Sequence, residues 1–309
     1  MRNFLSFGEP LVGFYPTDAA SVIDDVPITK TWGGDTSNFA IGVARLGHSV
    51  SYFSAVGDEP FGRGFLTLWK RNGVDTSLVS VDARRRTGLY FVSFEGKKHL
   101  FTYYRKGSAA SALSVDRIPE DLAKGYAALH LSGISLGMSA STRAAGLKLM
   151  QLFQASGRLI SFDINYRAAM WNSAKRASLV FSSAIGIGID ILEITDEEMS
   201  ALGWGESPAD IHKKFPLVRT IIVKRGSRGA LIYADGDSFS VPAFSVSVQD
   251  TVGAGDSFDA GYLSAILEGA QPRYAARFAA AAAAITCTGT GPLEKMPFKE
   301  DVLHFLASH

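Results

Sequence analysis

Short apolar runs alternate with stretches of helical periodicity along most of the sequence. Strands that alternate with helices of about 10–15 residues form βαβ units, so the pattern predicts a largely parallel, buried sheet. Right-handed crossovers then place helices on both faces of that sheet. The expected strands are Asn3–Gly8, Val50–Val56, Ala128–Ser132, Leu159–Asp163, Ile189–Ile194, Thr220–Lys224 and Ala230–Tyr233. The expected helices are Asn38–Leu46, Phe61–Asn72, Ser141–Ala155, Ala174–Ser183 and Asp196–Leu202.

Two stretches, Pro10–Trp32 and Gly88–Tyr104, interrupt this alternation. Both contain alternating apolar and polar residues without an intervening helix, and the turn Glu95–Lys98 makes the second a β-hairpin candidate. They predict a small antiparallel sheet inserted into the α/β domain. Such a sheet can cover an active site as a lid, or it can be an edge extension or a dimerisation surface, and these interpretations are compatible.

The charge balance excludes several classes of partner. Lys and Arg number 31 and Asp and Glu number 30, which gives a formal net charge of +1. Non-specific binding to nucleic acid or an anionic membrane needs a large positive excess, so we expect neither. The single cysteine, Cys287, favours a reducing, cytoplasmic compartment. No apolar run reaches the length of about 18 residues that a transmembrane helix needs, and Glu9 and Pro10 interrupt the N-terminal apolar segment, which argues against a signal peptide.

The most informative motif is the glycine-rich turn Asp250–Gly261, which leads into a helical pattern. Backbone N–H groups and the positive end of a helix dipole converge there, which is typical of an anion site. Gly253 and Gly255 permit a positive φ and let a phosphate approach the backbone closely. Asp256 either caps the helix or, beside a bound phosphate, accepts a proton from a hydroxyl. The segment alone leaves both interpretations open.

Three other polar stretches have a structural and a functional interpretation each. A diglycine turn precedes Asn38, which either caps a helix or binds a ligand. Asp163–Arg167 follows a buried strand, where ligands of open α/β sheets bind, so Arg167 is either a loop arginine or a partner for a carboxylate or phosphate. Lys224–Gly229 also follows an apolar strand and forms either a tight turn or part of a nucleotide site. The sequence contains no P-loop, no Gly-x-Gly-x-x-Gly after the first strand and no paired metal-ligand spacing among its histidines.

Two distant signatures together resemble the ribokinase-like carbohydrate kinases, also called the phosphofructokinase-B family. The first runs from Gly33 and Gly34 through Asn38 to Gly57, and the second is the segment Asp250–Gly261. The resemblance spans nearly the whole chain. It implies a three-layer α/β/α sandwich with a mostly parallel central sheet and a small β-sheet lid. It also implies one kinase domain over residues 1–309, with lid strands inserted at about 10–32 and 88–104.

Within that family the sequence looks most like the 2-keto-3-deoxygluconate kinases. The residues that carry this likeness include Gly8-Glu9, Gly33–Thr36, Tyr103–Arg105 and Asp163–Arg167. Two positions depart from the pattern: Thr195 stands where relatives often have asparagine, and Ala168 replaces a common proline. Because the substrate is a sugar acid, two arginines suit its carboxylate. The resemblance places Gly34, Asn38, Tyr90, Tyr103, Arg105, Arg167 and Asp256 in the substrate site.

The resemblance further implies the phosphorylation by ATP–Mg²⁺ of the primary hydroxyl of 2-keto-3-deoxygluconate, which yields the 6-phosphate. Asp256 would take the hydroxyl proton, and the N–H groups of Gly253, Ala254 and Gly255 would stabilise the transferring phosphoryl group. Glu198 would order the waters of the metal, or it is a glutamate of the helix surface. Asp250 and the backbone near Cys287–Gly291 could form a potassium site, as in some relatives. The residues expected to bind ATP are Asn165, Lys224, Gly226, Ser227, Gly229, Gly253 and Gly255.

Two alternatives stay open. The enzyme could phosphorylate a neutral sugar such as fructose or ribose, or a nucleoside, in which case Arg105 and Arg167 would not contact a substrate carboxylate. The fold could also bind a sugar or nucleotide as a sensor without turnover, although a pure sensor does not need Asp256. By family resemblance we expect a homodimer formed through the β-sheet lid.

Overall fold

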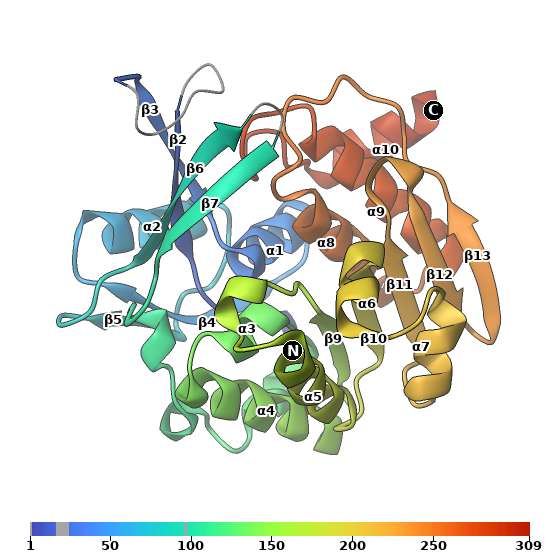
Figure 1. The fold of residues 1–309 in the computed structure, drawn as a ribbon, viewed down its shortest axis with the longest axis horizontal. Coiled ribbons are helices and arrows are strands. Elements are labelled where there is room, and N and C mark those ends of the chain that lie inside the picture. Colours follow the sequence, from blue (N-terminus) through green and yellow to red (C-terminus); the bar gives the residue numbers. More distant parts are fainter. Residues whose placement is uncertain (1, 17–24, 96–97) are drawn as a thin grey trace.

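A nine-stranded sheet forms the centre of the molecule in the computed structural model, which describes residues 2–16, 25–95 and 98–309 (Figure 1). The strand order is β13-β12-β11-β10-β9-β8-β1-β4-β5. The pairs from β11 through to β5 are parallel, whereas β12 pairs antiparallel with both β11 and β13. The strands are β1 (Arg2–Phe7), β4 (Val50–Gly57), β5 (Val79–Asp82), β8 (Tyr126–Ser132), β9 (Leu159–Asp163), β10 (Ile191–Thr195), β11 (Thr220–Lys224), β12 (Ala230–Ala234) and β13 (Asp237–Val241).

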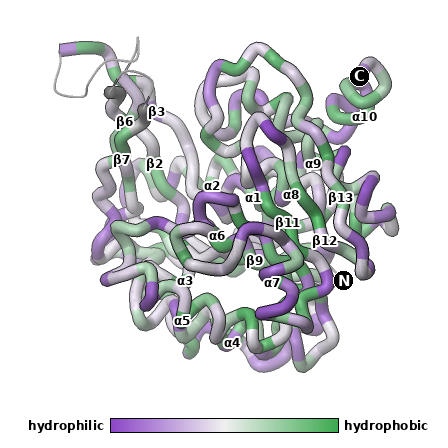
Figure 2. Tube along the Cα trace, turned by 45° about the vertical axis from the view of Figure 1, so that its right-hand side comes forward, coloured by the Kyte–Doolittle hydropathy of each residue, from purple (hydrophilic) through white to green (hydrophobic). Residues whose placement is uncertain are grey.

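The sequence predicted seven of these strands and missed the two at the ends of the strand order, β5 and β13. Both are short, and both carry exposed or half-exposed side chains that give no long apolar run. The central strands are covered on both faces, so their near-continuous apolar sequences were easily recognised. Figure 2 shows the same contrast, with hydrophobic colour along β11 and β12 and hydrophilic colour on the outer helix α7 (Pro208–Lys214).

Helices cover both faces of the sheet. One face packs against helices that share an apolar cluster with Phe4, Val50 and Ile222, and the other against helices that share a cluster with Leu129, Phe162 and Leu192. The first group comprises α1 (Asp35–Arg45), α2 (Pro60–Arg71), α8 (Ala254–Leu267), α9 (Pro272–Thr286) and α10 (Lys299–Ser308). The second comprises α3 (Gly133–Gly137), α4 (Ala140–Ala155), α5 (Ala174–Ile185), α6 (Asp196–Leu202) and α7. Among the described residues, no helix is long and apolar enough to span a bilayer.

Helix α1 begins three residues earlier than its periodicity predicted, at Asp35 instead of Asn38. The Asp35 carboxylate accepts the backbone N–H of Thr36 at 2.8 Å, which satisfies one of the unpaired donors at the helix start. Gly34, with φ of 98°, makes the preceding turn. Asn38 therefore lies inside the helix, and its side chain does not cap it.

A separate four-stranded sheet lies beside the central sheet, and we call it the lid sheet (Figure 1). Its strand order is β3-β2-β6-β7. Of the predicted hairpin turn Glu95–Lys98, the two middle residues, 96 and 97, lie outside the described residues, and Glu95 pairs with Lys98 in the antiparallel pair β6–β7. The prediction of an antiparallel sheet was wrong for one pair, because β2 and β6 are parallel. Each follows a strand of the parallel central sheet, β1 or β5, so both leave it in the same direction. The lid strands are β2 (Leu11–Pro16), β3 (Ile28–Gly33), β6 (Gly88–Glu95) and β7 (Lys98–Tyr104).

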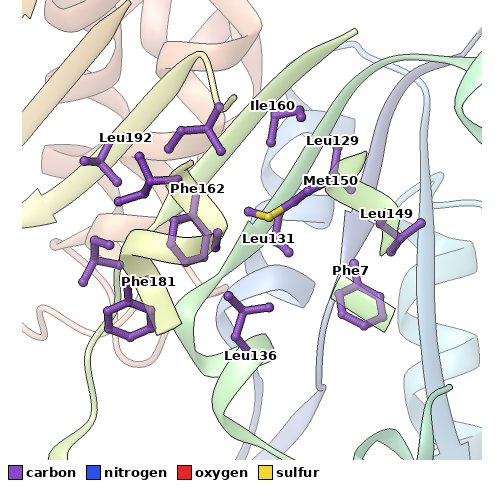
Figure 3. Packing of buried hydrophobic residues seen from close by; sticks show 14 of the residues in the cluster. Phe7, Leu129, Leu131, Leu136, Leu149, Met150, Ile160, Phe162, Phe181 and Leu192 are labelled. Atoms are coloured by element: carbon purple, nitrogen blue, oxygen red, sulfur yellow. The ribbon is translucent and has the colours of Figure 1, made fainter. Parts of the chain in front are cut away.

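Helix α5 contains one buried and one exposed apolar residue, so the contribution of burial to stability can be tested within a single helix. Phe181 is fully buried and packs edge-on against Phe162 and Trp171, as Figure 3 shows for the first pair, whereas Leu179 is 58% exposed. Phe181→Ala should lower the free energy of unfolding by about 3–5 kcal/mol, because it removes a buried ring and leaves a cavity. Leu179→Ala should change it by less than about 0.5 kcal/mol. Urea denaturation measures both, and equal effects would contradict the packing described.

Candidate active site

A cavity of about 1000 Å³ opens at the carboxyl ends of the central strands, between the lid sheet and the start of α8. Ligands of open α/β sheets bind at this edge. The wall of the cavity contains every residue that the sequence analysis assigned to substrate, nucleotide, Mg²⁺ waters or catalysis. These are Gly34, Asn38, Tyr90, Tyr103, Arg105, Asn165, Arg167, Glu198, Lys224, Gly226, Ser227, Gly229, Gly253, Ala254, Gly255 and Asp256.

The first turn of α8 presents a carboxylate and an uncapped helix end to the cavity. Gly253 precedes the helix with φ of 83°, and a Cβ there would lie 2.5 Å from Pro292, so only glycine fits. No side chain caps this helix, which leaves its first N–H groups for an anion. Asp256 is the third residue of α8, within its first turn, and accepts a hydrogen bond from Asn38 Nδ2 at 2.7 Å. The two signatures, 218 residues apart, therefore meet at this carboxylate.

Burial raises the pKa of Asp256 to about 7, and the nearby charge of Asp35 adds to this effect. The hydrogen bond from Asn38 and the positive charge of Lys224 act in the opposite direction and favour the ionised carboxylate. A carboxyl group with a pKa near neutrality can both accept and release a proton at physiological pH. The helix dipole alone would have made it a weaker base.

Lys224, at the end of β11, is surrounded by three carboxylates. Its Nζ lies 2.8 Å from Asp259 Oδ1 and 3.4 Å from Asp163 Oδ1. Glu193 Oε2 lies 3.8 Å away. Although burial opposes the charged ammonium, these carboxylates raise the pKa of Lys224 well above its usual value. Lys224 also lies beneath the α8 turn, since a Cβ added to Gly255 would be 3.5 Å from its Nζ.

Two of these carboxyl groups, Glu193 and Asp259, are almost completely buried. Burial raises the pKa of both, and the charge of Glu193 raises the pKa of Asp259 further, whereas a hydrogen bond with Asp259 lowers the pKa of Glu193. The network continues into the sheet, because Ser161 Oγ donates to Glu193 Oε1 at 3.3 Å and contacts His130 Nδ1 at 3.0 Å. Burial lowers the pKa of His130 to about 3, so this histidine is neutral.

The two arginines predicted to bind a substrate carboxylate differ in environment. Arg105 lies on the cavity wall with its side chain 11% exposed, and it forms an ion pair with Glu9, which is buried behind that wall. Arg167 is exposed, and no Asp or Glu of the described residues lies within 4 Å of its guanidinium nitrogens. The sequence analysis counted two available positive charges. The structure contains one, because Glu9 compensates the other.

Asp35 also faces the cavity, although the sequence analysis did not select it. Its Oδ2 accepts hydrogen bonds from Ser132 Oγ at 2.5 Å and from Asn165 Nδ2 at 3.0 Å. Asn165 adopts a left-handed backbone conformation with φ of 35°, which is uncommon for a residue with a side chain. The side chain of Asn165 therefore orients a carboxylate, and this contact accounts for its position independently of any nucleotide.

Glu198 closes a capping box at the start of α6. Its Oε2 accepts Thr195 N at 2.9 Å, and Thr195 Oγ1 accepts Glu198 N at 3.1 Å. Its Oε1 accepts Tyr166 N at 2.6 Å. The glutamate is buried and not on the helix surface, and burial raises its pKa. Thr195 thus has a structural role in place of the asparagine expected by resemblance.

The remaining part of the cavity lies beside the turn Gly226–Arg228, which joins the antiparallel strands β11 and β12. The tight turn that the sequence allowed is therefore present, and it lines the cavity as well. Gly229 must be glycine, because a Cβ there would lie 2.0 Å from Val241 O. Apolar residues of α9 and the Phe244 segment complete this side, and they include Val246, Val248, Ala280, Ala283 and Ala284.

The segments expected to hold potassium lie together. Asp250 Oδ2 accepts Gly291 N at 2.8 Å, and Gln249 N donates to Cys287 O at 2.9 Å. Potassium binding itself stays a prediction. Among the described residues, no cluster of three or more His, Cys, Asp or Glu side chains is arranged to hold a metal ion.

Besides Asp35, sequence reasoning missed four acidic residues around the site, and three of them had a local signal. Asp163 ends a buried strand, Glu193 is a charge within an apolar strand, and Asp259 lies one turn after Asp256 on α8. A charge in a position that periodicity makes buried requires a partner. Glu9 was noticed only as part of a family pattern, and its pairing with Arg105 depends on the tertiary fold.

Comparison with known proteins identifies similar chains over almost the full length. The model of the pfkB family carbohydrate kinases matches residues 1–299. Fructokinase-1 of Oryza sativa subsp. japonica is 33% identical over 98% of this chain and 97% of its own length. A 2-dehydro-3-deoxygluconokinase of Thermoproteus tenax is 30% identical over 96% of this chain and 92% of its own. The crystal structure of a putative ribokinase II from E. coli, in complex with ATP and Mg²⁺, superimposes with a TM-score of 0.90 at 27% identity and covers 100% of both chains.

The raised pKa of Asp256, about 7, makes a prediction for stability. The folded protein binds this proton more tightly than the unfolded chain does, so ionisation of Asp256 removes stability as the pH rises from about 4 to about 7. Asp256→Asn avoids this loss. The quantity to compare is the unfolding free energy of Asp256→Asn minus that of the parent protein. We expect this difference to be at least about 1 kcal/mol larger at pH 8 than at pH 4. Urea denaturation at both pH values, with exposed Asp237→Asn as control, measures the difference, and a pH-independent gain would contradict the perturbed pKa.

Proposed function

Because this chain belongs to the pfkB family of carbohydrate kinases, we propose that it transfers the γ-phosphoryl group of ATP to the primary hydroxyl of a 2-keto-3-deoxy sugar acid. The proposed substrate is 2-keto-3-deoxygluconate and the product is its 6-phosphate. One observation carries this choice. Arg167 places a guanidinium, without a carboxylate partner among the described residues, on the wall of the cavity that contains Asp256. A guanidinium binds a carboxylate through two parallel hydrogen bonds.

Asp256 is the proposed general base. As the substrate hydroxyl attacks, a new O–P bond forms, the bond to the ADP leaving group breaks, and the hydroxyl proton passes to the Asp256 carboxylate. A pKa of about 7 suits this role, because the group is partly ionised at neutral pH and basic enough to take the proton. Asn38 Nδ2 holds the carboxylate in place at 2.7 Å.

The surroundings of Asp256 suit the charge of a transferring phosphoryl group. The backbone N–H groups of Gly253, Ala254 and Gly255 lie at the positive end of α8. Lys224 adds a fixed positive charge beneath the same turn. Preorganised donors and charges of this kind stabilise phosphoryl transfer more than the ground state.

The proposed nucleotide site is the part of the cavity beside Gly226, Ser227 and Gly229, with the apolar wall of α9 for the base. Mg²⁺ is bound mainly by substrate phosphates, waters and one or two carboxylates, and it neutralises phosphate charge. Glu198 and Asp163 fit that requirement, since both carboxylates line the cavity and the two backbone hydrogen bonds of Glu198 leave other lone pairs available. Neither is arranged to hold the ion without the nucleotide.

A second candidate is the phosphorylation of fructose. Fructokinases are among the most similar relatives, and Glu9 cancels one of the two positive charges that a sugar acid would use. The mechanism at Asp256 would be unchanged, and only the role of Arg167 would differ. A non-catalytic sensor is disfavoured, because its function would not require a buried carboxylate with a pKa near 7 beside the uncapped N-terminus of α8.

The oligomeric state, domain extent, potassium site, location and lid role expected from the family are also part of this proposal. We infer a homodimer that covers the outer face of the lid sheet, where Ile28 and Tyr104 are 46% and 64% exposed. We also retain the single kinase domain over residues 1–309, the potassium site at Asp250 and a cytoplasmic location. The lid sheet lies over the cavity and would limit access of water to the phosphoryl group.

The substrate choice is tested with four acceptors. ATP-dependent phosphorylation of 2-keto-3-deoxygluconate, fructose, ribose and adenosine is measured for the parent protein and for Arg167→Ala. We expect a preference for the keto acid that falls at least about tenfold in the variant, because a charged hydrogen bond to the substrate is lost. Arg219→Ala, an 83% exposed arginine paired with Asp190, serves as the control. Equal or faster turnover of fructose would favour the second candidate.

The role of Asp256 is tested by Asp256→Ala, which should lower kcat by about 10²-fold or more, as expected for loss of a general base. In the parent protein kcat/KM should decline as the pH falls below about 7, where the carboxyl group becomes protonated. The exposed Asp237→Ala variant controls for loss of an unrelated carboxylate. Unchanged turnover in Asp256→Ala would remove this residue from the mechanism.

A further inference from the structure

Glu9 follows the first strand and lies just behind the cavity wall. Its side chain is 1% exposed, so no ligand in the cavity can reach it directly. One carboxylate oxygen accepts a hydrogen bond from Ser108 Oγ, and the other pairs with Arg105 Nη2. Arg105 does line the cavity. Glu9 therefore acts on the cavity through the guanidinium that it holds.

The surroundings of Glu9 fix this arrangement. A Cβ added to Gly88, the first residue of β6, would lie 2.8 Å from Glu9 Oε1, so the strand passes directly over the carboxylate. Arg105 comes immediately after β7, the other strand of the same hairpin. Burial raises the pKa of Glu9, while the Arg105 charge and the Ser108 hydrogen bond oppose that effect and favour the ionised form. The pair joins the end of β1 to the base of the lid.

The electrostatic consequence follows from burial. A charge with little solvent around it acts over several ångströms with a much lower effective dielectric constant than in water. A negative substrate group near Arg105 would be attracted by the guanidinium and repelled by the carboxylate directly behind it. Arg105 keeps its N–H donors in this pair, but the pair attracts an anion much less than an unpaired arginine would. Arg167, by contrast, is exposed and forms no ion pair within 4 Å among the described residues, although its charge favours ionisation of Glu198.

We propose that Glu9 is a specificity-determining residue, which sets the preference between anionic and neutral sugars by compensating the charge of Arg105. This inference rests on the proposed sugar-kinase function. With Glu9 ionised, Arg105 serves mainly as a donor to hydroxyl or keto oxygens. The acidic end of a sugar acid is then bound by Arg167, and a neutral ketose is not excluded.

The test compares kcat/KM for 2-keto-3-deoxygluconate with kcat/KM for fructose. Glu9→Gln removes the charge and keeps the shape of the side chain. We expect the ratio of the two values to shift toward the keto acid by at least about tenfold, because an uncompensated Arg105 attracts the carboxylate. Ser108→Ala, which removes a hydrogen bond from Glu9 but no charge, should leave the ratio within about twofold.

A double variant keeps the test decisive if Glu9→Gln is unstable, since it leaves no unpaired buried charge. In Glu9→Gln/Arg105→Met both charges are absent, so the ratio should stay within about threefold of the parent although both activities fall. Titration calorimetry with the two sugars provides the same ratio as binding constants, independently of turnover.

The outcomes separate the two proposals. An equal loss for both sugars in Glu9→Gln, or a double variant that loses the keto-acid preference, would overturn the role of Glu9 and leave the kinase proposal intact. A parent protein that phosphorylates none of the sugars would overturn the proposed function, and this inference with it. A shift toward the keto acid in Glu9→Gln, with none in Ser108→Ala, supports it.

Discussion

The ammonium group of Lys224 holds the functional edge of the sheet together. Asp163, Glu193 and Asp259 come from β9, β10 and α8, and they would repel one another if this charge were absent. Because α8 contributes Asp259, the same interaction fixes the start of that helix against the ends of the strands. Asp256, one turn earlier, is thereby placed opposite Asn38 of α1. The position of the proposed base is therefore determined by a buried charge network and not by α8 alone.

The elements that the sequence predicted are those whose side chains are buried in a regular pattern. Strands such as Leu159–Asp163 and Thr220–Lys224 were predicted with their observed bounds, since both of their faces are covered. The resemblance to the ribokinase-like kinases and the fold that it implied are confirmed by the family match and by the structural neighbours. The short edge strand Asp237–Val241 was missed, because an exposed strand lacks that pattern.

The candidate site was predictable for a different reason. Parallel strands bring their carboxyl ends to one edge, so polar residues after several strands must lie close together. What could not be predicted was which charges compensate one another. Arg105 and Lys224 appear as free cations in the sequence, and the fold supplies the carboxylates that neutralise them. Those pairings join residues far apart in the chain and have no local signature.

Overall sequence identity to known kinases does not identify the substrate, because the charge that a substrate meets depends on how a few side chains, such as Glu9 and Arg105, compensate one another. The fructokinase and the 2-dehydro-3-deoxygluconokinase among the relatives are about equally similar to this chain, at 33% and 30% identity. In the function proposed above, the difference between a neutral and an acidic substrate depends on a few charged side chains at or just behind the cavity wall. The proposal assigns this role to Arg167 and to the pair Glu9–Arg105.

The lid sheet has a consequence for the order in which the chain can fold. Its central pair, β2 and β6, is parallel, and α1, β4, α2 and β5 separate the two strands in the sequence. One long edge of β2 therefore remains without its partner until residues 88–95 have been synthesised and the first part of the central sheet has formed. All four lid strands lie within residues 11–104, whereas β8–β13 and α3–α10 come later in the chain, so during synthesis on the ribosome the lid strands precede most of the body that they cover. The cavity between lid and body is completed only when the α8 turn with Asp256 has been added, although the lid side of its wall is made within the first 104 residues.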